Sequence, residues 1–331
     1  MIGGYATSSE TSSWCKRHAE LCCGSLGRTG LKASQAGFGG YRVSAAMPDH
    51  AEALQLALAS GINLVDTSAN YADGQSEELI GEVIAQMVSA GRLRREEVVL
   101  VSKAGYLQGR NYLLSQERRR DGNPFPELVP YGEGLEHCIH PEFLEDQLDR
   151  SLARLGVETL DVYLLHNPEY FLGWALGQGQ HLEQAQAEYL RRIEQAFRYL
   201  ETEASKGRIR SYGISSNTFP VDHLDPQFSC LEKIWQKAES ITAAHHFHVI
   251  QMPMNLIETG AVLLANQPSG MTALALARSK DLGVLINRPL NAFTGKRLVR
   301  LADVNALPRM PEEEVRQRIA ALQKAETDFV Q

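Results

Sequence analysis

The feature that most constrains the fold is a repeated alternation of short apolar segments with amphipathic helical segments. Each apolar segment is followed by a stretch that places apolar residues at helical spacing. This alternation is typical of parallel βα units, in which a helix returns the chain to the start of the next strand. The predicted strands occupy residues 35–40, 61–66, 97–103, 160–165, 210–215, 247–252 and 283–287.

Seven such strands predict an α/β fold, a (β/α)8 TIM barrel whose eighth βα unit is missing or atypical. A barrel needs that eighth unit, because an open parallel sheet leaves backbone groups unpaired at its edges. After residue 287 the sequence predicts only a loop, 291–311, and a charged helix, 312–329. We therefore expect an N-terminal extension over residues 1–24 and one barrel domain over residues 25–331.

Two stretches interrupt the alternation and are predicted as long loops. Residues 105–140 contain Pro124, Pro126 and Pro130, and residues 171–186 form a second insertion. Loops that follow the strands of a parallel barrel surround its active site and set the choice of substrate. The identity of the substrate therefore does not follow from the sequence, and neither does the oligomeric state.

Composition disfavours several classes of partner and location. Acidic residues outnumber basic ones, 40 to 33, and the basic residues are scattered, which disfavours nucleic acid or an anionic membrane as partner. No apolar run approaches the roughly 20 residues of a membrane-spanning helix. Residues 1–24 lack the apolar stretch of a secretory signal, and five widely spread cysteines predict no disulfide framework. We therefore expect a reducing, cytoplasmic location.

Three titratable residues stand at the ends of consecutive predicted strands. They are Asp66, Lys103 and His166, and Tyr71 follows Asp66 by five residues. The carboxyl ends of barrel strands share one rim, so we expect these four side chains to meet at one mouth.

The chemistry of this set is that of a proton donor. A phenol titrates near ~10 and is a poor acid at neutral pH unless a nearby cation favours its anion. Lys103 can be that cation, and Asp66 can keep the lysine charged inside a partly dry barrel. His166 can donate a hydrogen bond to a carbonyl oxygen. The set provides a proton but no hydride, so a nicotinamide cofactor is required.

From about Leu26 to Leu290 the sequence resembles the aldo-keto reductase family. The resemblance rests on segments 26–31, 37–40, 61–71, 76–77, 102–103 and 164–166. It implies that Asp66, Tyr71, Lys103 and His166 form a catalytic tetrad with Tyr71 as general acid. It further implies NADPH-dependent reduction of an aldehyde or ketone.

The resemblance also implies where the cofactor binds. Ser215, Ser216 and Asn217 match the segment that holds the nicotinamide carboxamide, with Gln251 as a second partner. Gly39 is expected to let the backbone approach the cofactor. Two features depart from the family pattern, namely Asn287 and Arg288 where an aromatic residue often stacks, and the lack of an eighth strand to hold the adenosine phosphate. The basic residues expected to meet the phosphates instead are Arg288, Lys296 and Arg297, and they favour NADP over NAD.

Other interpretations of the same residues stay open. Asp66 and Lys103 could form a merely structural ion pair. Cys15, His18, Cys22 and Cys23 could be drawn as a zinc site, although adjacent cysteines rarely point the same way, and we expect no metal. The histidine clusters 137–140 and 245–248 are more simply core or loop residues.

Three further functions compete with the reductase. The barrel could bind a nicotinamide nucleotide as a sensor or regulatory subunit with little turnover. It could be a truncated, inactive reductase, or a metal-dependent hydrolase, although Lys103 stands where such an enzyme would need a ligand.

Overall fold

The computed structural model describes residues 1–294, 297–302, 311 and 313–321. The chain divides into two units. The first contains Met1–Met254 and Thr259–Asn287, and the second contains Asn255–Glu258 and Arg288–Gln331.

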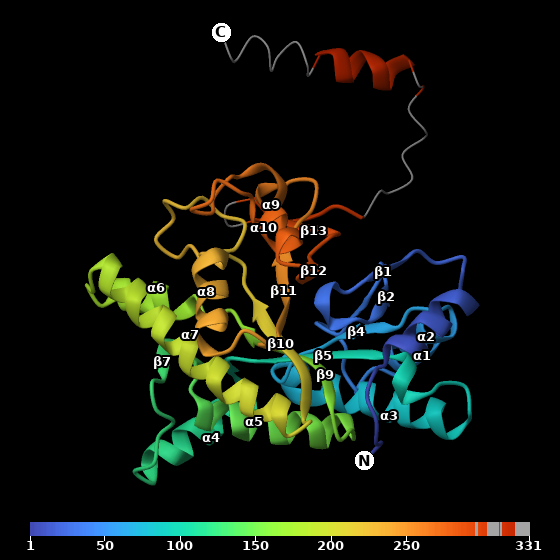
Figure 1. The fold of residues 1–331 in the computed structure, drawn as a ribbon, viewed down its shortest axis with the longest axis horizontal. Coiled ribbons are helices and arrows are strands. Elements are labelled where there is room, and N and C mark those ends of the chain that lie inside the picture. Colours follow the sequence, from blue (N-terminus) through green and yellow to red (C-terminus); the bar gives the residue numbers. More distant parts are fainter. Residues whose placement is uncertain (295–296, 303–310, 312, 322–331) are drawn as a thin grey trace. The chain divides into compact units, whose positions relative to one another are not determined.

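A parallel sheet of seven strands forms the centre of the first unit (Figure 1). Each predicted strand is present, and the sheet places them side by side in the order in which they occur in the chain. The strands are β3 (Phe38–Gly39), β4 (Leu64–Asp66), β5 (Val99–Ala104), β9 (Leu160–His166), β10 (Ile209–Ser215), β11 (Phe247–Pro253) and β12 (Gly283–Asn287). Every residue of β5 and β9 is buried, as expected of strands covered on both faces.

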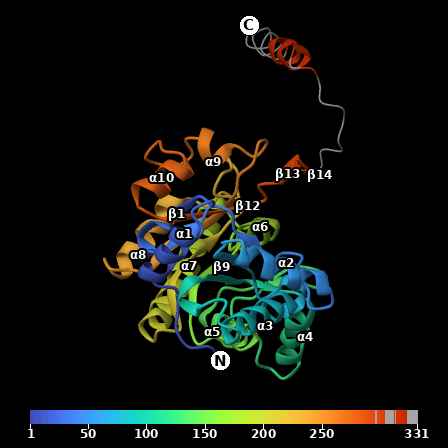
Figure 2. The same ribbon diagram turned by 90° about the vertical axis from the view of Figure 1, so that its right-hand side faces the viewer.

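The connections between these strands are helical, as the βα alternation predicts (Figure 2). The helix α5 (Pro141–Leu155) illustrates the cause, since Pro141 stands at its first turn, Gly156 ends it in a left-handed conformation, and Leu144 and Leu148 are fully buried. The other helices of the first unit that follow the sheet strands are α2 (Pro48–Ala59), α3 (Gln75–Ser89), α6 (Tyr170–Gly177), α7 (Leu182–Ser205), α8 (Leu231–Ile241), α9 (Gly260–Leu263) and α10 (Ala273–Ser279).

Both insertions are ordered rather than loops, which corrects the expectation from sequence. Residues 171–186 contribute to α6 and α7. The insertion at 105–140 contains α4 (Gly109–Arg120) and a three-stranded antiparallel sheet of β6 (Tyr106–Leu107), β7 (Val129–Gly132) and β8 (Leu135–His137). Strands of two to four residues are too short to show a strand period in the sequence. The proline content of residues 105–140 therefore suggested a loop where the structure has a small sheet.

The region after β12 agrees with an atypical eighth unit. Among the described residues no eighth strand joins the parallel sheet. In the second unit, β13 (Asn291–Thr294) and β14 (Arg297–Arg300) form an antiparallel pair where a loop was predicted. Residues 313–321, the described part of the predicted C-terminal helix, are helical.

The N-terminal residues pack into the first unit. Ile2 bridges Val157 beside α5, and α1 (Ser8–Arg17) buries Trp14, whose indole N–H donates to the Gly61 carbonyl at 2.8 Å. The antiparallel pair β1 (Cys23–Ser25) and β2 (Lys32–Ser34) follows α1. In the connection between these two strands, a 3-10 turn at residues 27–29 packs so tightly that a Cβ on Gly27 would lie 2.2 Å from the Gly283 nitrogen.

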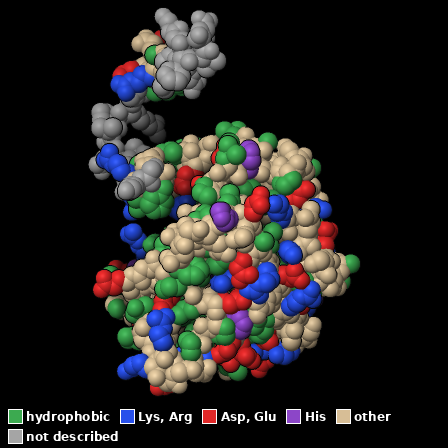
Figure 3. Space-filling view, turned by 90° about the vertical axis from the view of Figure 1, so that its left-hand side faces the viewer, with side chains coloured by type: hydrophobic (Ala, Val, Ile, Leu, Met, Phe, Trp, Pro, Cys, Tyr) green, Lys and Arg blue, Asp and Glu red, His purple; other side chains and the backbone are tan. Residues whose placement is uncertain are grey.

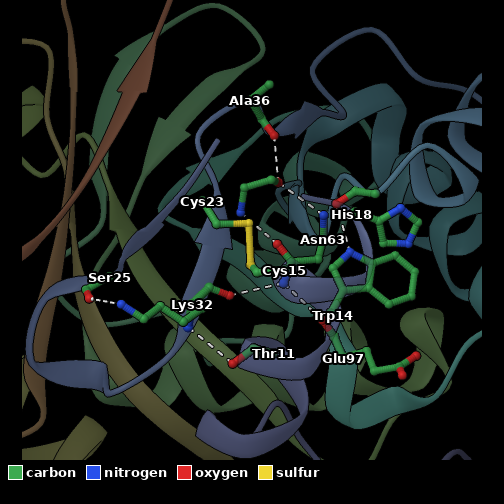
Figure 4. The surroundings of a disulfide bond; sticks show 12 residues. Thr11, Trp14, Cys15, His18, Cys23, Ser25, Lys32, Ala36, Asn63 and Glu97 are labelled. Carbon is green, nitrogen blue, oxygen red and sulfur yellow. Dashed lines mark hydrogen bonds between the residues drawn. A yellow bond between two sulfur atoms is a disulfide. The ribbon is translucent and has the colours of Figure 1, made fainter. Parts of the chain in front are cut away.

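A disulfide joins Cys15 of α1 to Cys23 of β1, a pair that the expectation of no disulfide framework did not include (Figure 4). After α1 the chain reverses, with the Leu21 N–H donating to the His18 carbonyl, and the two Cα atoms come within 6.1 Å. An odd number of cysteines does not exclude one local pair. The bond also rules out the zinc site drawn from these cysteines, since both sulfur atoms are already bonded.

Acidic and basic side chains are mixed on the face that Figure 3 displays. On α7 the side chains of Arg198 and Glu194 lie one turn apart and pair at 2.7 Å. An exposed pair of this kind contributes about 0–1 kcal/mol, so it does not determine the fold. None of the helices in the described part of the chain combines the length and the apolarity that crossing a bilayer requires.

The buried face of α5 offers a test of this fold. Leu148 is fully buried, so Leu148→Ala should lower the free energy of unfolding by about 2–5 kcal/mol, through lost burial and a residual cavity. Leu56→Ala, on the exposed side of α2, is the matched control and should change it by about 0.5 kcal/mol or less. Denaturant unfolding measures both values. Equal stability of the two variants would refute the packing described for α5.

Candidate active site

Asp66, Tyr71 and Lys103 meet at the carboxyl ends of β4 and β5. The Lys103 ammonium donates to Asp66 Oδ2 at 2.7 Å and to the Tyr71 hydroxyl at 3.3 Å. It donates a third bond, at 2.7 Å, to the Thr67 carbonyl. Lys103 is fully buried, so the ammonium exchanges water for three protein acceptors.

The loop after β4 brings Tyr71 back over the lysine. The Tyr71 N–H donates to the Ser68 carbonyl, and a 3-10 turn begins at Tyr71. Ala72 and Asp73 then adopt left-handed backbone angles, with φ of 46° and 58°, a conformation that is costly for non-glycine residues. This sharp turn leaves the Lys103 ammonium 4.8 Å from the centre of the phenol ring.

The charges in this cluster follow from burial and from the ion pair. Burial disfavours the Lys103 ammonium, but Asp66 and Tyr71 outweigh it, and the pKa of Lys103 is raised. Burial also raises the pKa of Tyr71, although Lys103 opposes this shift. At neutral pH the site therefore holds a charged lysine and a protonated phenol.

His166 ends β9, the neighbour of β5 in the sheet. Its Nδ1 lies 3.0 Å from the Ser68 hydroxyl, and its ring centre lies 5.8 Å from that of Tyr71. Burial, together with the charge of Lys103, holds the pKa of His166 well below its usual range. The imidazole is therefore neutral beside the phenol. The three residues predicted at the strand ends and Tyr71 from the following loop thus come together.

The insertion at 105–140 provides neighbours that the sequence analysis missed. Tyr106 meets the His166 ring edge to face with centres 4.7 Å apart, and His137 Nε2 lies 2.7 Å from the His166 carbonyl. Tyr170, at the start of α6, packs edge to face on Tyr106. The position of the insertion directly after β5 was the available signal, because the loops that follow barrel strands surround the active site.

The residues predicted to bind nicotinamide lie beside this cluster. Gln251 donates from Nε2 to Asp66 Oδ1 at 3.0 Å and accepts from the Ser215 hydroxyl at 2.9 Å. Ser216 is fully buried, and its hydroxyl lies 3.2 and 3.3 Å from those of Thr218 and Ser229.

The last two residues predicted to bind the cofactor, Asn217 and Gly39, differ in exposure. Asn217 is half-buried, and its N–H donates to a buried carboxylate, Glu169, at 2.9 Å. Gly39 is exposed at the end of β3, and a Cβ there would meet no atom within 4 Å.

The residues predicted to bind the cofactor phosphates belong to the second unit. Arg288 forms an ion pair with Glu258 at 2.7 Å, and Arg297 is exposed at the start of β14. Lys296 lies outside the described residues. The roles of these three residues stay predictions.

No group of three or more histidine, cysteine, aspartate or glutamate side chains is placed to hold a metal ion in the part of the chain that the structure describes.

Comparison with known proteins places the chain in a family. The profile of the aldo/keto reductase family matches residues 35–292, so the chain belongs to this family. It is 23% identical to the aldo-keto reductase YhdN of Bacillus subtilis over 71% of this chain and 54% of that protein. It is 27% identical to a 6-dehydroglucose reductase of Novosphingobium aromaticivorans over 58% of this chain and 51% of that protein. The chain thus spans about half the length of these curated relatives.

A solved structure supports the fold. The holo form of an aldo-keto reductase from Bacillus halodurans superposes with a TM-score of 0.53 at 18% identity, over 80% of this chain and 65% of that one. The similarity confirms the α/β fold of (β/α)8 type expected from the sequence.

The ion pair at the centre of the site yields a prediction for stability. Asp66→Asn leaves a buried ammonium without a counter-charge, which should cost about 3–5 kcal/mol at pH 7. Asp149→Asn, which removes an exposed partner of Arg208, should cost about 1 kcal/mol or less. Urea unfolding measures both variants.

The folding stability of the wild type and that of Asp66→Asn should change with pH in opposite directions. In the wild type the raised pKa of Lys103 gives stability that is complete below about pH 10.4 and is lost only above it. In Asp66→Asn, burial should lower the pKa of Lys103, so the unfolded chain binds more protons below about pH 10.4 and stability rises with pH. A variant as stable as the wild type at pH 7 would contradict the buried pair.

Proposed function

We propose that this chain catalyses NADPH-dependent reduction of an aldehyde or ketone to an alcohol, with Tyr71 as general acid. The observation that carries the proposal is the position of the Lys103 ammonium, 2.7 Å from Asp66 Oδ2 and 3.3 Å from the Tyr71 hydroxyl. Membership of the aldo/keto reductase family, with relatives named as reductases, supports the same activity.

Each member of the cluster has one task in this proposal. Tyr71 keeps its proton at neutral pH and gives it to the carbonyl oxygen as negative charge develops there. Lys103 stabilises the phenolate that remains, and Asp66 keeps Lys103 charged. His166 is neutral, and orienting the carbonyl oxygen requires the tautomer with its single proton on Nε2. In that tautomer Nδ1 accepts from the Ser68 hydroxyl, in place of the bond from this hydroxyl to Asn70 Oδ1 at 2.7 Å.

The polar groups beside the cluster fit a nicotinamide. Ser215, Ser216, Asn217 and Gln251 bring hydroxyl and amide groups, which match the donor and acceptor of a carboxamide. Ser215 and Gln251 bond to each other, and the Ser216 hydroxyl lies near those of Thr218 and Ser229, so a bound carboxamide would share or replace these bonds. A reduced nicotinamide, when bound, supplies the hydride that the side chains cannot. The preference for NADPH rests on the predicted roles of Arg288, Lys296 and Arg297.

The aromatic neighbours of His166 suggest how a substrate is held. Tyr106 packs against the imidazole and Tyr170 packs against Tyr106, so the two rings shield one side of the imidazole. A drier site strengthens the hydrogen bonds that stabilise developing charge. We propose a small-molecule carbonyl compound as substrate. The cytoplasmic location stays a prediction from the N-terminal sequence.

Removing the phenol hydroxyl tests the proposal. Tyr71→Phe should lower the rate of carbonyl reduction about 10²–10⁴-fold, because it removes the proton donor, while the dissociation constant of NADPH stays within about threefold. Tyr41→Phe is the matched control, since the exposed Tyr41 ring packs edge to face on Tyr71 at 5.3 Å and keeps that contact without its hydroxyl. NADPH oxidation against a panel of aldehydes and ketones measures both. Undiminished reduction by Tyr71→Phe would refute the assignment.

A further inference from the structure

Glu169 is a buried carboxylate for which the proposed chemistry has no use. It lies three residues after His166 and is 2% exposed. Within the described residues no lysine or arginine acts on its charge, and its Oε2 has no hydrogen-bond donor. A buried carboxylate without a counter-charge is costly, so its presence requires an explanation.

The contacts of Glu169 point toward the predicted nicotinamide segment. Its Oε1 accepts from the Asn217 N–H at 2.9 Å. Two residues earlier, the Asn167 N–H donates to the Ser215 carbonyl at 2.7 Å, from a left-handed backbone with φ of 51°. His166 itself pairs in register with Ser215. The loop after β9 is thus tied to the segment after β10 at both ends of residues 215–217.

The surroundings of Glu169 hold hydroxyl groups rather than charges. Tyr106, Tyr170 and Tyr189 face it from β6, α6 and α7, and burial raises the pKa of all three phenols, which stay neutral near pH 7. Burial also raises the pKa of Glu169 to about 7, despite hydrogen bonding from the backbone and from the Ser216 side chain that favours the ionised form. The nearby histidines do not titrate in this range, because burial lowers the pKa of both His137 and His166.

We propose that Glu169 is a positioning residue: its carboxylate holds the Asn217 backbone in place for the nicotinamide, and nucleotide affinity depends on whether that carboxylate is ionised. The inference rests on the proposed function, since it concerns the same cofactor. An ionised carboxylate accepts a stronger hydrogen bond than a neutral acid. Above pH 7 the charged Glu169 fixes the Asn217 N–H firmly, and below pH 7 the protonated form holds it less well.

Equilibrium fluorescence titration of the full chain with NADPH and with NADH between pH 6 and pH 8 tests the proposal. NADH lacks the 2′-phosphate, whose own ionisation near pH ~6 would otherwise contribute. The wild type should bind both nucleotides at least about threefold more tightly at pH 8 than at pH 6, as expected when a charged acceptor replaces a neutral one. Glu183→Gln, an exposed glutamate in the first turn of α7, should keep this pH dependence.

Two variants of Glu169 separate the charge from the hydrogen bond. Glu169→Gln keeps an acceptor of the same shape, so its affinity should be independent of pH and close to that of the wild type at pH 6. Glu169→Ala removes the acceptor and should weaken binding about tenfold or more at pH 8. In turnover assays this loss should appear in the KM for the nucleotide more than in kcat.

The outcomes distinguish the inference from the function beneath it. If the wild type binds neither nucleotide at any pH, the proposed function fails and the inference fails with it. If the wild type binds but Glu169→Gln keeps the wild-type pH dependence, the inference alone is overturned. A merely structural role would lower the thermal stability of Glu169→Gln without changing that dependence.

Discussion

The interaction on which the site depends is the ion pair between Lys103 and Asp66. Burying an ammonium costs several kcal/mol, and an unpaired one would lose its proton at neutral pH. Adjacent parallel strands place the carboxylate 2.7 Å from the ammonium, and the Thr67 carbonyl accepts a further bond. The arrangement of the strands thereby stabilises a positive charge on the fully buried Lys103 side chain.

The ion pair connects the other polar groups of the site. Asp66 uses its second oxygen to accept from Gln251, which in turn accepts from Ser215, so the network reaches across the sheet from β4 to β11. Burial keeps His166 neutral, and the Lys103 charge adds to this effect, because a second cation beside a buried ammonium is disfavoured. The Lys103–Asp66 pair therefore contacts or influences the proposed acid Tyr71, the neutral imidazole of His166 and the amide of Gln251.

The parts of the fold that could be predicted from sequence are those that carry a period or a strand end. Continuous apolar runs in the sequence indicate the buried strands β5 and β9. Lys103 and His166 follow or end these runs, and the carboxyl ends of parallel strands lie at one edge of the sheet, so their proximity could be predicted. Tyr71 could be placed only in the loop after Asp66, because its position depends on left-handed angles at Ala72 and Asp73 that no pattern indicates.

Other features depend on tertiary contacts that leave no local signal. Tyr106 meets His137 by antiparallel pairing across a 31-residue separation, which resembles a loop when the sequence is viewed alone. Cys15 and Cys23 approach because the chain reverses after α1. Glu169 looks like an ordinary helix-start glutamate, and its significance follows from burial and from a bond to Asn217.

The protonation state of Lys103 most directly tests whether a buried ammonium lies beside Tyr71. Nitrogen-15 NMR of lysine-labelled protein, with the Lys103 signal assigned by its loss in Lys103→Met, reports whether the side chain is an ammonium or an amine. We predict an ammonium from pH 6 to beyond pH 10, because Asp66 outweighs the cost of burial. A neutral amine at pH 7 would contradict the account, since Tyr71 would then have no cation beside it.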